Sequence, residues 1–164
     1  MREGRSAMGD GGVKNRVDYA GVEALATRAV RHAGDAAAAL QAGVEVLKSA
    51  VPHYSWVGVY LIDGDELVLG PSLGKPSPHT RIPLGRGICG AAATERQTII
   101  VDDVNSDARY LACSLETKSE IVVPIMKHGE VLGEIDIDSD QPAAFGTLDR
   151  EMLESVAEAM AARL

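Results

Sequence analysis

The segment that decides the fold is Ser119–Asp138, which reads SEIVVPIMKHGEVLGEIDID. It contains two runs of alternating character, Ser119–Met126 and Glu130–Asp138, joined by a short turn. Nearly all of the odd-numbered positions are apolar. The even-numbered positions include four carboxylates, Glu120, Glu134, Asp136 and Asp138. Alternation with a period of two is typical of strands with one buried face. The segment therefore predicts a β-hairpin with one apolar face and one acidic face.

The turn of this hairpin sets which residues lie opposite one another. A two-residue loop at His128-Gly129 pairs odd with even positions and breaks the apolar face. A three-residue loop that starts at Lys127 pairs Glu120 with Asp136 and keeps that face intact, with its glycine in the left-handed conformation. Because a slip of one residue turns every side chain to the opposite face, we predict the three-residue loop. Glu120, Asp136 and Asp138 then cluster on one sheet face.

This acidic cluster has more than one interpretation. Like charges that lie opposite each other in a sheet are destabilising. On a solvent-exposed face the repulsion is small, and most sequences with this pattern form such a face. A pocket for a cation is the alternative, because gathered carboxylates need a positive partner. A metal ion and an ammonium group fit equally well, and the pattern alone does not choose between them.

Length and composition limit the classes of protein. The chain has 164 residues, 46% hydrophobic and 24% charged, with a net charge of -8, as expected for one globular domain. An acidic chain is a poor nucleic-acid binder. No apolar run approaches the ~20 residues of a membrane helix, and no signal-peptide core is present. Two cysteines make no disulfide scaffold, so we expect a cytoplasmic protein with reduced thiols.

The order of elements predicts an α+β fold. Residues 1–16 are Gly-rich and charged, and we expect a disordered tail followed by a single domain over residues 17–164. Helical spacing predicts helices at Tyr19–Gly34 and from Asp35 to about Val51, and a last helix capped by Thr147. That helix carries the apolar stripe Leu148, Met152, Val156 and Met160. The terminal helices should cover the apolar face of an antiparallel sheet, leaving the acidic face towards a loop-covered pocket.

A strand at Tyr54–Ile62 places aromatic residues two pleats apart. Trp56, Gly58 and Tyr60 share one face, and Val57 and the other apolar residues share the opposite face. Ordinary packing explains such a pair. An aromatic wall that holds a small ligand or cation is the sharper alternative.

The two cysteines lie in different local contexts. Cys89 belongs to a glycine-rich segment at a helix start, where the macrodipole lowers a thiol pKa, although a small buried packing residue is the alternative. Cys113 lies in the loop Val104–Thr117, just ahead of the acidic strand, and loops often carry function. No CxxC motif and no Cys/His pair at metal spacing occurs in the chain. We therefore expect no metal site.

Five segments of the chain resemble one family. They are W-x-G-x-Y-L at Trp56–Leu61, L-V-L-G-P at Leu67–Pro71, R-I-P-x-G-R-G-x-C-G at Arg81–Gly90, S-E-I-V-x-P at Ser119–Pro124 and D-I-D-S at Asp136–Ser139. The arrangement resembles a GAF domain and, more narrowly, the free methionine-(R)-sulfoxide reductase family. A GAF fold alone does not specify function, whereas these segments together are far more specific.

The resemblance implies a reductase of the free amino acid's sulfoxide, with no bound cofactor and with thioredoxin and NADPH as the external reductant. It implies three carboxylates that hold the substrate ammonium: Glu120, Asp136 and Asp138. It implies an aromatic wall of Trp56 and Tyr60. Cys113 corresponds to the attacking nucleophile, which becomes a sulfenic acid, and Cys89 corresponds to an auxiliary cysteine. We also expect a homodimer through the helices at the chain ends.

One position departs from the family pattern. The family carries a resolving cysteine two residues before the R-I-P segment, where this chain has His79. Cys89 can substitute for it, an external thiol can attack Cys113 directly, or the pocket survives as a binding module with little turnover. Two hypotheses follow: a free methionine-(R)-sulfoxide reductase, and a non-catalytic GAF module that senses an amino-acid-like ligand.

Overall fold

A computed structural model describes residues 16–112 and 114–164 of the chain. The predicted tail lies almost wholly outside these residues. The described helices are α1 Tyr19–His32, α2 Ala36–Ala50, α3 Gly87–Glu95 and α4 Thr147–Ala161, with a 3-10 turn η1 at Val104–Ser106. The described strands are β1 Trp56–Asp63, β2 Glu66–Leu73, β3 Arg81–Pro83, β4 Ile99–Val101, β5 Ser119–Lys127 and β6 Glu130–Ser139.

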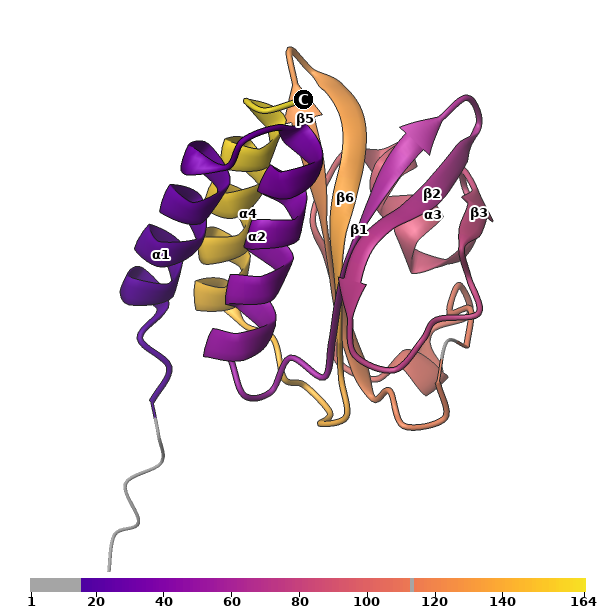
Figure 1. Cartoon of the computed structure of the whole chain (residues 1–164). Coiled ribbons are helices and arrows are strands. Elements are labelled where there is room, and N and C mark those ends of the chain that lie inside the picture. The colour runs from indigo at the N-terminus through magenta and orange to yellow at the C-terminus, as the bar shows by residue number, and fades with distance from the viewer. Residues whose placement is uncertain (1–15, 113) are drawn as a thin grey trace, which may run out of the picture.

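The strands form one antiparallel sheet in the order β3-β2-β1-β6-β5-β4. Helices α2 and α4 pack on one face of the sheet, and α1 packs outside them against both (Figure 1). The short helix α3 lies on the opposite face, against β3, β5 and β6. The prediction of an α+β fold with the terminal helices on one face is confirmed, and the acidic face of the hairpin is the one that α3 and the loops cover.

The helix ends follow from local hydrogen bonding. Asp35 caps α2 by accepting a bond from the Ala38 N–H, as predicted. The start of α4 differs from the prediction, because Gly146 is the cap and the Asp149 carboxylate accepts the Gly146 N–H at 2.9 Å. The predicted apolar stripe of α4 is wrong at Leu148, which is 58% exposed.

The hairpin register differs from the prediction and explains how the acidic face is built. The loop is the two-residue His128-Gly129 turn, with φ of 51° and 79°, and Lys127 pairs with Glu130. Between Ile125 and Met126 the register shifts by one residue, so that Leu132 has no partner. This bulge restores the pairing of odd with odd positions that a two-residue loop would otherwise break. Glu120 therefore lies opposite Asp138 rather than Asp136.

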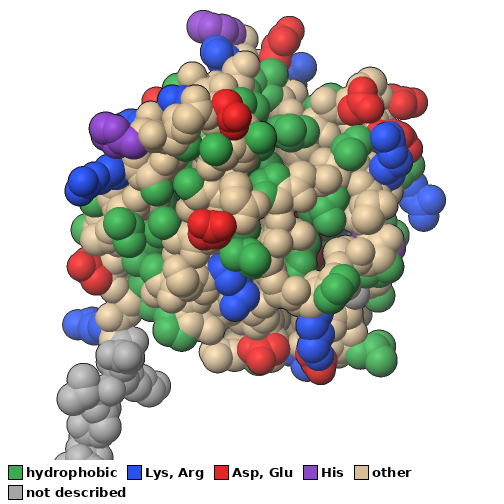
Figure 2. All heavy atoms as spheres, viewed as in Figure 1, with side chains coloured by type: hydrophobic (Ala, Val, Ile, Leu, Met, Phe, Trp, Pro, Cys, Tyr) green, Lys and Arg blue, Asp and Glu red, His purple; other side chains and the backbone are tan. Residues whose placement is uncertain are grey.

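The surface carries both signs of charge. On the face shown in Figure 2, Lys and Arg side chains are interspersed with Asp and Glu. No helix among residues 16–112 and 114–164 is long and apolar enough to cross a membrane.

Candidate functional site

Strand β6 lies between β1 and β5, and this order assembles the acidic face. Asp138 has Trp56 on one side and Glu120 on the other, while Asp136 lies between Gly58 and Val122. Glu120, Asp136 and Asp138 are all buried. The structure thus brings together the three carboxylates that the sequence singled out, on the face away from α2 and α4. Burial of three carboxylates in a row is costly unless a positive partner or protons compensate for it.

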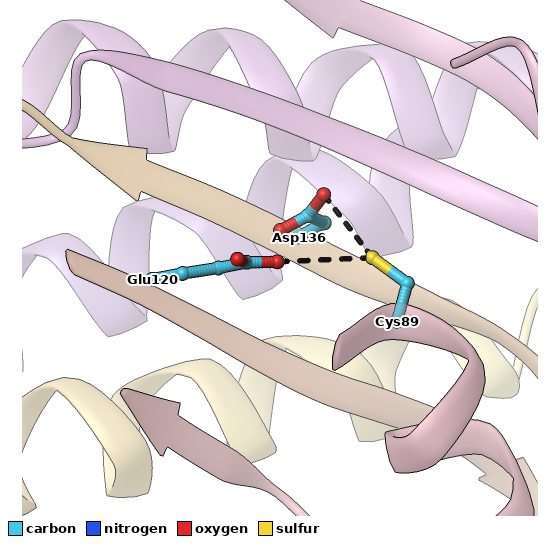
Figure 3. Close-up of side chains that lie close together, drawn as sticks. All are labelled: Cys89, Glu120 and Asp136. Carbon is cyan, nitrogen blue, oxygen red and sulfur yellow. Dashed lines mark hydrogen bonds between the residues drawn. The ribbon is translucent and has the colours of Figure 1, made fainter. Parts of the chain in front are cut away.

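The thiol of Cys89 meets two of these carboxylates. Cys89 projects from α3 towards Glu120 of β5 and Asp136 of β6 (Figure 3). Its Sγ donates to Asp136 Oδ2 at 3.3 Å and lies 3.9 Å from Glu120 Oε1. The three residues come from sequence positions up to 47 apart, so no local spacing could reveal their contact.

The prediction that the helix start favours the Cys89 thiolate is wrong. Burial raises the pKa of the Cys89 thiol well above its usual value, and the negative charges of Asp136, Glu134 and Glu120 raise it further. The favourable field of one helix terminus is worth about 1 kcal/mol. Desolvation and nearby anions outweigh it here, so Cys89 stays a protonated hydrogen-bond donor.

The pKa values of the three buried carboxyl groups are raised to different extents. Burial raises the pKa of Asp136 to about 6, while bonds with Cys89 and Glu120 lower it. Burial and the charge of Asp136 raise the pKa of Glu120 and Asp138 well above the usual value. Among the described residues, no Lys, Arg or His forms an ion pair with this cluster. The cluster therefore holds protons that a cation would displace.

The aromatic residues of β1 lie beside the acids. A Cβ on Gly58 would clash with the ring of Trp56, so the absence of a side chain there lets the indole lie across β1, next to Asp136. Tyr60 is buried, its ring centroid is 6.5 Å from that of Trp56, and its hydroxyl donates to the His79 carbonyl at 2.8 Å. The two rings are neighbours along β1, and of the two only Trp56 is among the described residues that line a cavity on this face.

Two cavities lined by described residues open onto this face. The larger has a volume of about 180 Å³. Its lining includes Trp56, Thr117 and Asp138, with the paired Lys75 and Glu116 at its edge. The Thr117 hydroxyl donates to Asp138 Oδ2 at 3.4 Å.

The smaller cavity has a volume of only about 10 Å³ and is lined by His79, Cys89, Glu120 and Asp136, among others. Asp138 therefore faces a space that can hold an amino acid, while Asp136 and Glu120 face a space close to the size of one water molecule.

Some residues of the site were not predicted, and one predicted residue cannot be placed. Glu134 precedes Asp136 by two positions in β6 and is fully buried. Its place in the same period-two pattern could have assigned it to the acidic cluster. Thr117 and Lys75 carried no signal, because loop residues show no periodicity.

Cys113, the predicted nucleophile, lies outside the described residues. The carbonyl of the preceding Ala112 accepts a bond from His79 Nε2 at 3.1 Å.

Comparisons with known proteins identify the family of the chain. The GAF domain family model matches residues 35–164. GAF domain-containing protein A of Dictyostelium discoideum is 44% identical over 105 residues, which are 63% of this chain and 66% of that protein. Free methionine-R-sulfoxide reductase of Saccharomyces cerevisiae is 44% identical over 115 residues, 68% of this chain and 63% of that protein. In both cases the match spans slightly less than two thirds of the relative's length.

A solved structure extends the likeness to most of the chain. The free methionine-R-sulfoxide reductase of Neisseria meningitidis, in complex with its substrate, has a TM-score of 0.84 and 39% identity. The match covers 88% of this chain and 87% of that one. These findings confirm the predicted fold and family resemblance: the chain belongs to the GAF family and is related to the free methionine-R-sulfoxide reductases.

Proposed function

We propose that this protein reduces free methionine-(R)-sulfoxide to methionine, with Cys113 as the nucleophile and thioredoxin, supplied with electrons by NADPH, as the external reductant. No bound cofactor takes part. The relatives named as free methionine-R-sulfoxide reductases support the reaction class. The buried carboxylates support the choice of substrate, because they favour a free amino acid, which carries an ammonium group, over a methionine residue in a protein.

One observation carries the proposal: among three buried carboxylates without a paired cation among the described residues, Asp138 lines a cavity of amino-acid size, and Asp136 and Glu120 are its neighbours on the same sheet face. A free amino acid brings an ammonium group together with the sulfoxide, whereas a methionine sulfoxide residue inside a protein chain has no ammonium group. We place the ammonium near Asp138 and Asp136, whose side chains leave the same face of β6. Asp136 Oδ1 has no hydrogen-bond partner among the described residues, so it is available as an acceptor. The wall formed by Trp56 adds an apolar and cation-attracting surface.

The chemistry balances with thiols alone. The Cys113 thiolate attacks the sulfoxide sulfur, the sulfoxide oxygen takes a proton, and methionine leaves while Cys113 becomes a sulfenic acid. A thiol then displaces water from the sulfenic acid and forms a disulfide. A second external thiol releases Cys113 in its reduced form. The sulfoxide gains the two electrons that the two thiols lose.

The resolving step falls to an external thiol in our proposal. The family resemblance implies that His79 stands where the family carries its resolving cysteine. The Cys89 thiol donates to Asp136, and burial together with the nearby carboxylates raises its pKa. A protonated thiol attacks poorly. After one equivalent of substrate without reductant, we expect mass spectrometry to find a trappable sulfenic acid on Cys113. A Cys89–Cys113 disulfide would show instead that Cys89 resolves.

The protonated state of Cys89 also favours a second candidate function, because a chain without an internal resolving thiol can bind a ligand without turnover. This candidate is a GAF module that binds an amino-acid-like ligand. Both candidates use the carboxylates and Trp56, and only the reductase uses Cys113. The deciding experiment measures NADPH consumption with thioredoxin, thioredoxin reductase and free methionine-(R)-sulfoxide. We expect turnover for the wild type and none for Cys113→Ser or with the (S) epimer. Binding of the sulfoxide without NADPH consumption would identify the module.

A further inference from the structure

The larger cavity carries both signs of charge in its wall. Asp138 of β6 and Lys75, from the loop that follows β2, both line it. Asp138 is buried, whereas the Lys75 side chain is 71% exposed at the cavity's edge. Among the described residues that line this cavity, Lys75 is the only Lys, Arg or His. The cavity therefore has a buried anion in its wall and a single cation at its edge.

A free amino acid brings two charges into this cavity, and the ammonium site accounts for only one of them. The carboxylate is attached to the same carbon atom as the ammonium group. A ligand whose ammonium lies near Asp138 and Asp136 therefore places its carboxylate in the same cavity. A carboxylate next to these acids is repelled unless a cation faces it, because like charges brought together are costly. Lys75 is the described cation that lines this space.

Lys75 already holds a carboxylate at the cavity wall. Its Nζ donates to Glu116 Oε2 at 2.5 Å, and Glu116 lines the same cavity from a segment 41 positions further along the chain. The Glu116 side chain is 65% exposed, and a pair between two exposed side chains adds little to stability. Exchange of Glu116 for the carboxylate of a ligand is therefore inexpensive.

We propose that Lys75 binds the α-carboxylate of the ligand, which takes the place of Glu116 on the Lys75 ammonium. The inference rests on the proposed function, because it takes the ligand to be a free amino acid held by its ammonium group. It also narrows the substrate. Carboxylates that bind an ammonium accept the first residue of a peptide as well, since that residue keeps its amino terminus. A lysine for the α-carboxylate selects the free amino acid over a peptide that begins with methionine sulfoxide.

The test is calorimetry in a Cys113→Ser background with two ligands, free methionine-(R)-sulfoxide and its amide, which keeps the ammonium and lacks the carboxylate. We expect the acid to bind more tightly than the amide. Lys75→Met should lower the ratio of the two affinities about fivefold, the upper range for an exposed ion pair. Lys75→Arg should keep the ratio. The matched control is Lys118→Met, which removes an exposed cation that lines neither cavity, and it should also keep the ratio.

Glu116→Gln separates an exchanged partner from a structural link between two loops. This variant removes the anion that competes for Lys75, so the acid-to-amide ratio should rise about two- to fivefold. If the pair only holds the loops together, Glu116→Gln and Lys75→Met should weaken both ligands alike, and that result would overturn the proposal. Equal affinity of the two ligands in the Cys113→Ser background, or a ratio that Lys75→Met leaves unchanged, would overturn it as well.

Failure of this inference differs from failure of the reductase assignment. Methionine release by the wild type, together with a ratio that does not depend on Lys75, would reject the carboxylate site and keep the reductase. A ratio that falls in Lys75→Met and rises in Glu116→Gln, without methionine release by the wild type, would keep the carboxylate site and reject the reductase.

Discussion

Replacing Asp136 by Asn tests whether the acidic face holds an ammonium group. Asp136 is 3% exposed, its Oδ2 accepts the Cys89 thiol, and its Oδ1 has no partner among the described residues. An ammonium that donates to Oδ1 makes one charge-assisted hydrogen bond, worth about 1.5–3 kcal/mol. At about 1.4 kcal/mol per tenfold change, Asp136→Asn should weaken the binding of free methionine sulfoxide by about 10- to 150-fold.

The assay is calorimetry in a Cys113→Ser background, so that binding is measured without chemistry. The ligands are free methionine-(R)-sulfoxide and its N-acetyl form, which lacks the positive charge. The matched control is Glu130→Gln, which removes an exposed carboxylate from the same strand and should leave the affinity unchanged. Equal affinity of the protein for the two ligands, or an unchanged affinity in Asp136→Asn, would refute the ammonium site.

Three further predictions concern neighbouring features. Gly58→Ala should displace the Trp56 ring and weaken ligand binding about tenfold, measured in the same calorimeter; unchanged binding would show that the indole position is not used. Glu134→Leu should raise the free energy of unfolding by about 1–3 kcal/mol, because it removes a fully buried acid whose oxygens lack a hydrogen-bond partner among residues 16–112 and 114–164; a lower free energy of unfolding in urea would contradict this. Asp149→Asn should cost about 1.5–3 kcal/mol at neutral pH. Burial raises the Asp149 pKa, but hydrogen bonds from His53, Gly146 and Tyr54 lower it below 3.8 overall, so the wild type's advantage should disappear as pH falls below that value; an advantage that persists in acid would contradict this.

The sequence predicted the faces of the hairpin but not its register. Period-two alternation identified which side chains share a face, and that assignment is correct from Glu120 to Ile125. The bulge at Leu132 was hidden because Val131 and Leu132 are both apolar. On the turn side of the bulge the faces exchange, and Val131 packs with the Trp56 side of the sheet. Alternation carries no information on an extra residue when its neighbours have the same polarity.

The contacts of Cys89 could not be predicted from the sequence for a different reason. A helix start is a local feature, and the expectation of a lowered thiol pKa followed from it. The carboxylates that reverse this effect come from β5 and β6, 31 and 47 positions further along the chain. Electrostatics at a buried group depends on all elements packed against it.

A single turnover without reductant tests the reductase assignment directly. The reduced protein is mixed with one equivalent of free methionine-(R)-sulfoxide, and the released methionine is measured by chromatography. We expect close to one methionine per chain for the wild type, with a sulfenic acid trapped on Cys113, and none for Cys113→Ser. Release of no methionine by a folded wild-type protein that binds the sulfoxide, with Cys113 still a free thiol, would contradict the reductase assignment.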